Sequence, residues 1–207
     1  MAIIKRPLSL PDMPEPWTAT ADLADLCATL SEPAPAARRW AARGLAAFPE
    51  ATATLVAHLM QETDASVREA VLTSLTEIGN GEAVSGLVQC LRSEDVALRN
   101  AAIDAMGHLP DAVAPVMADL LTDADPDVRI FSVNILQSLR HPAVEQWLIG
   151  VIRHDSHVNV CATAVDLLTE VGSPAAREAL EALRLRFPGE PYIDFATGLA
   201  LKRIAEA

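Results

Sequence analysis

Apolar residues recur along this chain with a helical spacing that appears five times. The five segments are APAARRWAARGLAAFP from Ala34, DASVREAVLTSLTEIG from Asp64, DVALRNAAIDAMGHLP from Asp95, DPDVRIFSVNILQSLR from Asp125 and HVNVCATAVDLLTEVG from His157. Their first apolar positions are Ala37, Val67, Leu98, Val128 and Val160, so the period is about 31 residues. Further apolar positions follow at offsets of roughly 4, 5, 8 and 11, which predicts one buried helix face and excludes the alternation of a strand.

Each segment is followed by a second helical stretch, so every unit is predicted to be a pair of antiparallel helices. These second stretches are residues 50–62, 82–93, 112–122, 143–153 and 174–187. At offset 8 the first helices carry Leu45, Leu75, Met106, Leu136 and Leu168. At offset 4 they carry Ala41, Val71, Ala102, Ser132 and Ala164, small side chains that let a neighbouring helix approach closely.

The two ends of the chain fit the same scheme. Residues 20–31 and 191–205 are each predicted to form a single helix that caps the array, because terminal repeats need a solvated outer face. Residues 20–207 are therefore expected to form one repeat domain, preceded by a Pro-rich, extended arm over residues 1–19. Trp17 is interpreted as an anchor that holds this arm against the first helices. The alternative is that Trp17, Leu8 and Leu10 form a peptide that docks on a partner.

The pattern D-x-x-V-R-x-x-A with a period near 31 resembles the HEAT-like repeats of phycobilisome lyases. The resemblance covers about residues 21–205 and implies an all-α fold, an α-α superhelix (α-solenoid) of about five helical hairpins with half-repeat caps. It says little about function, because one fold serves many roles. The fifth unit departs from the pattern, since Cys161 stands at the arginine position and two extra residues lengthen the preceding turn.

The charge of the chain excludes several classes of partner. The formal net charge is −12, and residues 62–127 hold thirteen Asp or Glu against three Arg. Nucleic acids and anionic membranes are bound through basic side chains, and no basic face or arm is visible here. We therefore expect neither as a partner, and the lack of any apolar stretch of about 18 residues predicts no membrane helix.

Cysteines and histidines give little sign of chemistry. Cys27, Cys90 and Cys161 are far apart and read as free thiols in a reducing compartment, so a cytoplasmic location is expected. One local group, His154, Asp155, His157 and Cys161, has the residue types of a metal site but is more typical of a solvated turn. No nucleophile stands in a recognisable catalytic motif, so no cofactor, metal or catalytic residue is predicted.

Arginines and aspartates recur at one point of each unit and predict a structural ladder between units. Its members are Arg38, Arg68, Arg99, Arg129, Asp64, Asp95, Asp125 and Asp127. The resemblance further implies that the second helices line the concave face. The predicted protein-binding residues on that face are His58, Gln89, Cys90, Asp119, Ile149 and Glu181.

Three functions remain open on the sequence. The leading hypothesis is a non-catalytic adaptor or scaffold whose concave face binds another protein, in a signalling or assembly complex. The alternative, implied by the family resemblance, is a bilin lyase-like subunit that attaches or detaches a tetrapyrrole on a phycobiliprotein, together with a companion subunit. The third is a chaperone-like subunit that stabilises a cofactor-bearing enzyme during its maturation.

Overall fold

The computed structural model describes residues 21–206, and within this range all regular structure is helical. The predicted arm, residues 1–19, lies outside the described residues. The α-helices are α1 (Leu23–Thr29), α2 (Pro35–Leu45), α3 (Thr52–Leu59), α4 (Ala65–Ile78), α5 (Gly81–Cys90), α6 (Val96–Gly107), α7 (Pro110–Leu120), α8 (Pro126–Ser138), α9 (Val144–His154), α10 (Val158–Val171), α11 (Arg177–Arg186) and α12 (Pro191–Glu206). Short 3-10 turns, η1 (Pro49–Ala51) and η2 (Pro174–Ala176), precede α3 and α11.

Local sequence signals set where the helices begin and end. Asp64, Asp95 and Asp125 accept hydrogen bonds from backbone N–H groups in the first turns of α4, α6 and α8. An aspartate at this position satisfies donors that have no partner within the helix. At the other end of α4, Gly79 has a φ of 57°, a left-handed conformation that terminates a helix readily.

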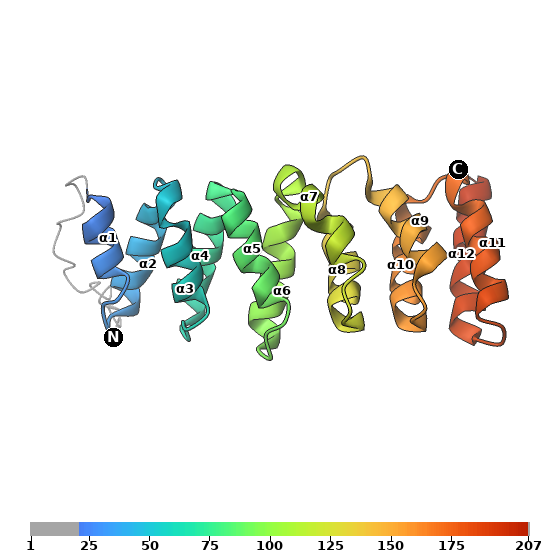
Figure 1. The fold of residues 1–207 in the computed structure, drawn as a ribbon, viewed down its shortest axis with the longest axis horizontal. Coiled ribbons are helices and arrows are strands. Elements are labelled where there is room, and N and C mark those ends of the chain that lie inside the picture. The colour runs from blue at the N-terminus through green and yellow to red at the C-terminus, as the bar shows by residue number, and fades with distance from the viewer. Residues whose placement is uncertain (1–20, 207) are drawn as a thin grey trace, which may run out of the picture.

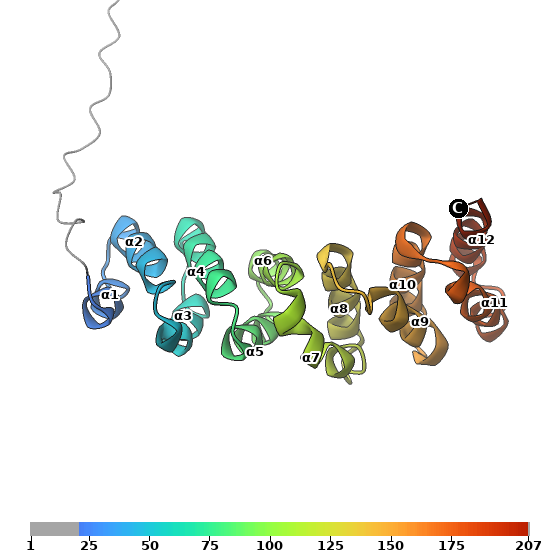
Figure 2. The same cartoon turned by 90° about the horizontal axis from the view of Figure 1, so that it is seen from above.

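The helices form two rows that run side by side along the molecule (Figures 1 and 2). The first helices of the units, α2, α4, α6, α8 and α10, stack in sequence and are followed by α12. The second helices form the other row, which begins with α1 (Figure 2). Five hairpins with a single helix at each end result, so the predicted helical solenoid is confirmed.

The row of helices bends gently, and α2, α4, α6, α8, α10 and α12 lie on the inner side of the bend (Figure 2). This orientation is the reverse of the expected one, in which the second helices line the concave face. The repeat spacing fixes which face of each helix is buried, but the direction of the bend depends on small rotations between successive hairpins.

One apolar core runs through all the hairpins. The side chains at offset 8 are all 2% exposed or less, and those at offset 4 are fully buried, including the hydroxyl of Ser132. Ser132 Oγ donates to the backbone carbonyl of Val128 at 2.7 Å, which satisfies the only polar group at these positions. The core therefore holds successive units in fixed register and makes the two surfaces of the array rigid.

Candidate functional site

The first predicted ladder arginine joins α2 to the turn before α4. Arg38 Nε and Nη2 donate to the two carboxylate oxygens of Glu62 at 2.7 and 2.9 Å. Glu62 is only 5% exposed, and its hydrogen bond with Arg38 lowers the pKa of this carboxyl to about 2. Sequence reasoning named Asp64 as the nearby acid; its side chain instead caps α4, and its hydrogen bond with Ser66 lowers its pKa.

Two further arginines form ion pairs with the next unit. Arg68 Nη1 lies 2.7 Å from Asp95 Oδ2. The pKa of Asp95 is lowered, first by the hydrogen bond from the backbone N–H of Leu98 and second by the hydrogen bond from Arg68. Arg129 Nε and Nη2 donate to Asp155 at 2.6 and 3.1 Å, which raises the pKa of the guanidinium. Asp155 was not among the predicted ladder residues, because it lies outside the D-x-x-V-R phrase.

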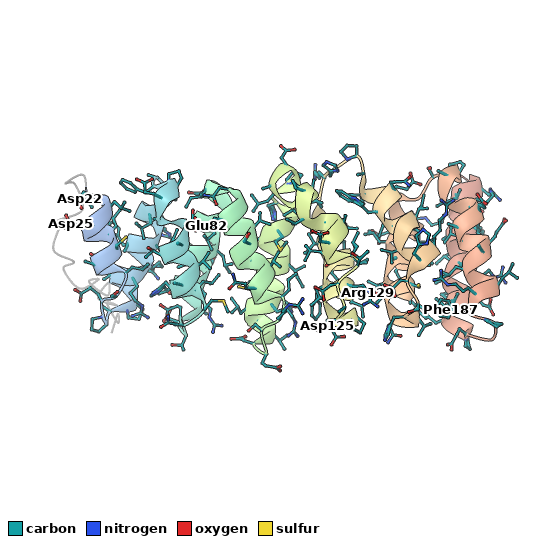
Figure 3. All side chains as sticks on the ribbon, in the orientation of Figure 1. Asp22, Asp25, Glu82, Asp125, Arg129 and Phe187 are labelled. Atoms are coloured by element: carbon teal, nitrogen blue, oxygen red, sulfur yellow. The ribbon has the colours of Figure 1, made fainter. Side chains whose placement is uncertain are left out.

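Arg99 differs from the other ladder arginines. Its guanidinium lies 4.8 Å from the centre of the Phe131 ring and donates to the carbonyl of Ser93. Within the described residues it has no ion pair, although Asp125 and Asp127 stand at the start of the next unit. Asp125 lies at the same end of α8 as Arg129 (Figure 3), where it caps the helix, while Asp127 is exposed in the first turn.

The predicted protein-binding residues do not form one exposed strip. Their side chains are exposed at Gln89, Asp119 and Glu181, half-buried at His58, and buried at Cys90 and Ile149. Because Cys90 is 0% and Ile149 3% exposed, these two pack in the core and present no contact surface. The His58 ring lies 2.8 Å from Glu62, so it belongs to the Arg38 ion-pair network. A binding role for the exposed residues stays a prediction.

A groove of about 560 Å³ opens between α7 and α9, which make almost no contact although they are neighbours in the outer row. The contrast with α3 and α5 is clear, since a Cβ added at Gly86 would lie 2.3 Å from Val56 Cγ2. A Cβ added at Gly150 on α9 meets no heavy atom within 4 Å. The outer row is therefore tightly packed at α3–α5 and open at α7–α9.

The lining of this α7–α9 groove is mostly apolar. Ala118 and Leu121 contribute from the end of α7, and Trp147, Gly150 and Val151 from α9. Ala118, Ala124 and Gly150 leave space in the groove, while the Trp147 indole offers a large flat contact surface. Such a site suits a flat, apolar ligand.

Polar groups surround the groove without forming a catalytic arrangement. The Arg129 guanidinium is held by Asp155, and His154 is exposed at the edge. Trp147 stacks on His141 with ring centres 4.9 Å apart, which fixes the orientation of the indole. The Trp147 indole and the Arg129 guanidinium are therefore held in fixed positions at the groove. Sequence reasoning missed it, although the break before α9, with His141 followed by Pro142, marks the local irregularity.

The side chains named as a possible metal site have other roles in the fold. Asp155 is paired with Arg129, and Cys161 is fully buried. Among residues 21–206, no three His, Cys, Asp or Glu side chains are grouped so as to hold a metal ion. Burial raises the pKa of both the Cys90 and the Cys161 thiol to about 11, so neither is an activated nucleophile.

Residues 21–206 also contain no helix with the length and apolar character required to span a bilayer.

Two curated relatives match most of this chain. PecE of Mastigocladus laminosus, a bilin biosynthesis protein, is 31% identical over 173 residues, which cover 82% of this chain and 61% of the relative. PecE of Nostoc sp. strain PCC 7120 is 28% identical over 174 residues, which cover 82% of this chain and 66% of the relative. The chain thus spans less than two thirds of the length of these relatives.

Solved structures of similar arrangement share little sequence with the chain. The complex of CpcE and CpcF of phycocyanin lyase from Nostoc sp. PCC7120 gives 18% identity and a TM-score of 0.39, covering 95% of this chain and 99% of that chain. Human deoxyhypusine hydroxylase gives 16% identity and a TM-score of 0.47, and the match covers 89% of this chain and 84% of that chain. An archaeal HEAT-like repeats protein from Thermococcus onnurineus NA1 gives 16% identity and a TM-score of 0.46. The match covers 91% of this chain and 90% of that chain.

The similarity to PecE contradicts the leading hypothesis of a non-catalytic adaptor or scaffold. Nothing in the repeats themselves separates an adaptor from a lyase subunit, which is why the sequence pattern favoured the more common role. The curated relatives are named for bilin biosynthesis, so they support the alternative instead.

The repeat pattern itself is identified independently of any single relative. The family model of HEAT repeats matches residues 23–107, 52–122 and 113–186, which together cover most of the chain. The matched segments follow the same succession of hairpins that the structure shows. This chain therefore belongs to the HEAT-repeat family.

Proposed function

We propose that the chain is a bilin lyase-like subunit, which binds an open-chain tetrapyrrole and acts with a protein that carries or receives it. The observation that supports this most directly is the 31% identity to the bilin biosynthesis protein PecE over 82% of the chain. A companion subunit is included in the proposal, as the resemblance to phycobilisome lyases implies. A cytoplasmic location is proposed with it.

The α7–α9 groove is the proposed place for the bilin. A bilin is a flat, conjugated chain of four pyrrole rings with two carboxylate side arms, so it needs an apolar surface with polar groups at the edge. The groove offers the Trp147 indole and the exposed Ala118 side chain, with the His154 ring at its edge. Its volume of about 560 Å³ lies within the range of typical small-molecule sites.

The direct test titrates the purified chain with a free bilin and follows visible absorption and indole fluorescence. Binding is expected to shift the bilin spectrum and to quench the part of the indole emission that comes from Trp147, one of three tryptophans. Gly150→Leu fills the groove and is expected to weaken binding about tenfold, equal to about 1.4 kcal/mol. Gly198→Leu is the matched control, because an added Cβ at Gly198 on α12 also meets no heavy atom within 4 Å.

Two outcomes overturn the placement of the bilin: no spectral change at any bilin concentration, or equal weakening by both leucine variants. The lyase-like activity needs a separate assay. The chain, a companion subunit, a bilin and an apo-acceptor protein are incubated, and the acceptor is then denatured and examined for covalently attached pigment. Pigment that stays on the acceptor only when this chain is present supports the proposal, and attachment that is unchanged without it contradicts it.

A further inference from the structure

A second groove, of about 550 Å³, lies on the inner row between α4 and α6. Leu72, Leu98 and Ala105 form its floor, and Ala101 and Thr73 leave its walls low. Because α4 has 14 residues and α6 has 12, the groove can follow the helices for about 18 to 21 Å at 1.5 Å per residue. It lies in a different row of helices from the α7–α9 groove.

The charges beside this α4–α6 groove are predominantly negative. Glu69 and Glu77 line it from α4, and Asp104 lines it from α6. All three are exposed, and among the described residues none of them forms an ion pair. The one arginine in the lining, Arg68, is already neutralised by Asp95 at 2.7 Å.

We propose that the α4–α6 groove docks a basic amphipathic helix of a partner protein. Small side chains at Ala97, Ala101 and Thr73 allow a third helix to approach to the usual 8–10 Å between axes. The apolar floor matches one stripe of such a helix, and carboxylates on both walls match Lys or Arg on its two flanks. Complementary charge of this kind gives specificity and speeds association.

The charge of the groove selects this occupant over others. A nucleic acid or an anionic lipid surface would be repelled by Glu69, Glu77 and Asp104. An acidic helix would place like charges against both walls. The groove thus differs in its ligand from the α7–α9 groove, and this inference does not depend on bilin binding.

The test uses a fluorescein-labelled synthetic helix of about 15 residues, with leucines on one stripe and lysines on both flanks. Its fluorescence anisotropy is followed while the full chain is added. The same helix with glutamates in place of lysines, and a scrambled lysine peptide of identical composition, are expected to bind at least about tenfold more weakly. The triple variant Glu69→Lys, Glu77→Lys, Asp104→Lys is expected to lose at least about tenfold in affinity for the lysine helix.

The matched control carries three charge reversals of the same sign outside the groove, Glu32→Lys, Glu170→Lys and Glu190→Lys. All three are exposed, and none forms an ion pair within residues 21–206. This control is expected to bind the lysine helix within about twofold of the unmodified chain at 0.15 M salt, because exposed charges are largely screened beyond about 8 Å.

Equal loss in both triple variants would mean that only the net charge matters, and would overturn the proposal. Failure of the unmodified chain to bind the lysine helix, or equal binding of the scrambled peptide, would do the same. Helical circular dichroism of each variant shows whether it is folded. The Ala101→Phe variant adds a test that leaves the charge unchanged, since it fills the groove and is expected to weaken binding to a similar extent.

Discussion

Arg186 on α11 contacts the Sγ of Cys161 on α10 at 3.2 Å. Cys161 stands where the four earlier units have an arginine, and in those units the guanidinium donates to the carbonyl six residues before it. In the fifth unit that carbonyl belongs to Asp155, and Arg186 donates to it instead, as well as to the carbonyl of Arg153. The next helix therefore supplies the guanidinium that the fifth unit lacks.

Removal of this guanidinium is expected to destabilise the C-terminal end of the array. Arg186→Ala should lower the free energy of unfolding by about 1 kcal/mol, because hydrogen bonds to the two carbonyls are lost. Cys161→Arg alone should also destabilise, since two guanidinium groups then compete for one site. The double variant should be more stable than Cys161→Arg alone, because the introduced arginine would then occupy the site without competition. Urea unfolding of the four proteins measures this coupling, and strictly additive effects would contradict it.

Breaking the Arg38–Glu62 pair is expected to cost more than breaking a more exposed pair. Glu62→Gln leaves the Arg38 guanidinium without its carboxylate in a site where the two side chains are 14% and 3% exposed, and should cost about 3 kcal/mol. Asp95→Asn removes the more exposed Arg68 pair but keeps a good helix cap, and should cost clearly less stability than Glu62→Gln. Similar losses in the two variants, measured by urea unfolding, would argue against the ranking by burial.

The same carboxylate makes stability depend on pH. The pKa of Glu62 falls from an ordinary 4.5 to about 2 in the folded chain, so the unfolded chain binds a proton first as the pH drops. Its stabilising effect is complete above about pH 5 and is lost between about pH 4.5 and 2. Glu62→Gln should therefore lose less stability than the unmodified chain over this interval. Parallel pH dependences of the two unfolding midpoints would show that other carboxylates dominate.

Cysteine reactivity separates buried from accessible thiols. Cys90 and Cys161 are fully buried with a pKa near 11, whereas Cys27 is half-buried. At pH 8 only about one in a thousand of the buried thiols is ionised, and reagents do not reach them without local unfolding. Iodoacetamide should label Cys27 first in the native chain. Mass spectrometry of the digested chain measures the extent of labelling at each cysteine. Equal labelling rates for the three sites before denaturant is added would contradict the buried placement.

The fold was predictable because its determinants are local and repeated. A buried residue such as Leu75 recurs as Met106 one period later, and an aspartate such as Asp95 marks a helix start by its own side chain. Each unit therefore repeats the same information about its helices and core. The direction of the bend has no comparable signal, because it sums small rotations between hairpins, and the expected orientation of the two rows was wrong.

The candidate site was much less predictable. The α7–α9 groove exists because two helices about 30 residues apart fail to close on each other, and this depends on how the break before Val144 places α9. In the same way, the partner of Arg129 is Asp155 in a turn that follows a different helix. Such contacts are set by packing between units, whereas the periodic pattern describes only the interior of each unit. Trp147 was therefore visible in the sequence, but its position in a groove was not.

Two helical glycines in the outer row give opposite expectations for the same substitution. Gly150→Ala should raise the free energy of unfolding by about 0.5–1 kcal/mol, because alanine restricts the unfolded chain and its Cβ meets no heavy atom within 4 Å. Gly86→Ala should lower it by about 1–3 kcal/mol, because its Cβ would lie 2.3 Å from Val56 Cγ2 and force α3 and α5 apart. The double variant Gly86→Ala, Val56→Ala should recover part of this loss, since it removes the clashing methyl groups.

Thermal unfolding followed by circular dichroism checks the three variants and the unmodified chain. Stabilisation by Gly86→Ala would show that the outer row is not closed at α3–α5. A loss of stability in Gly150→Ala would equally show that the α7–α9 groove is not open.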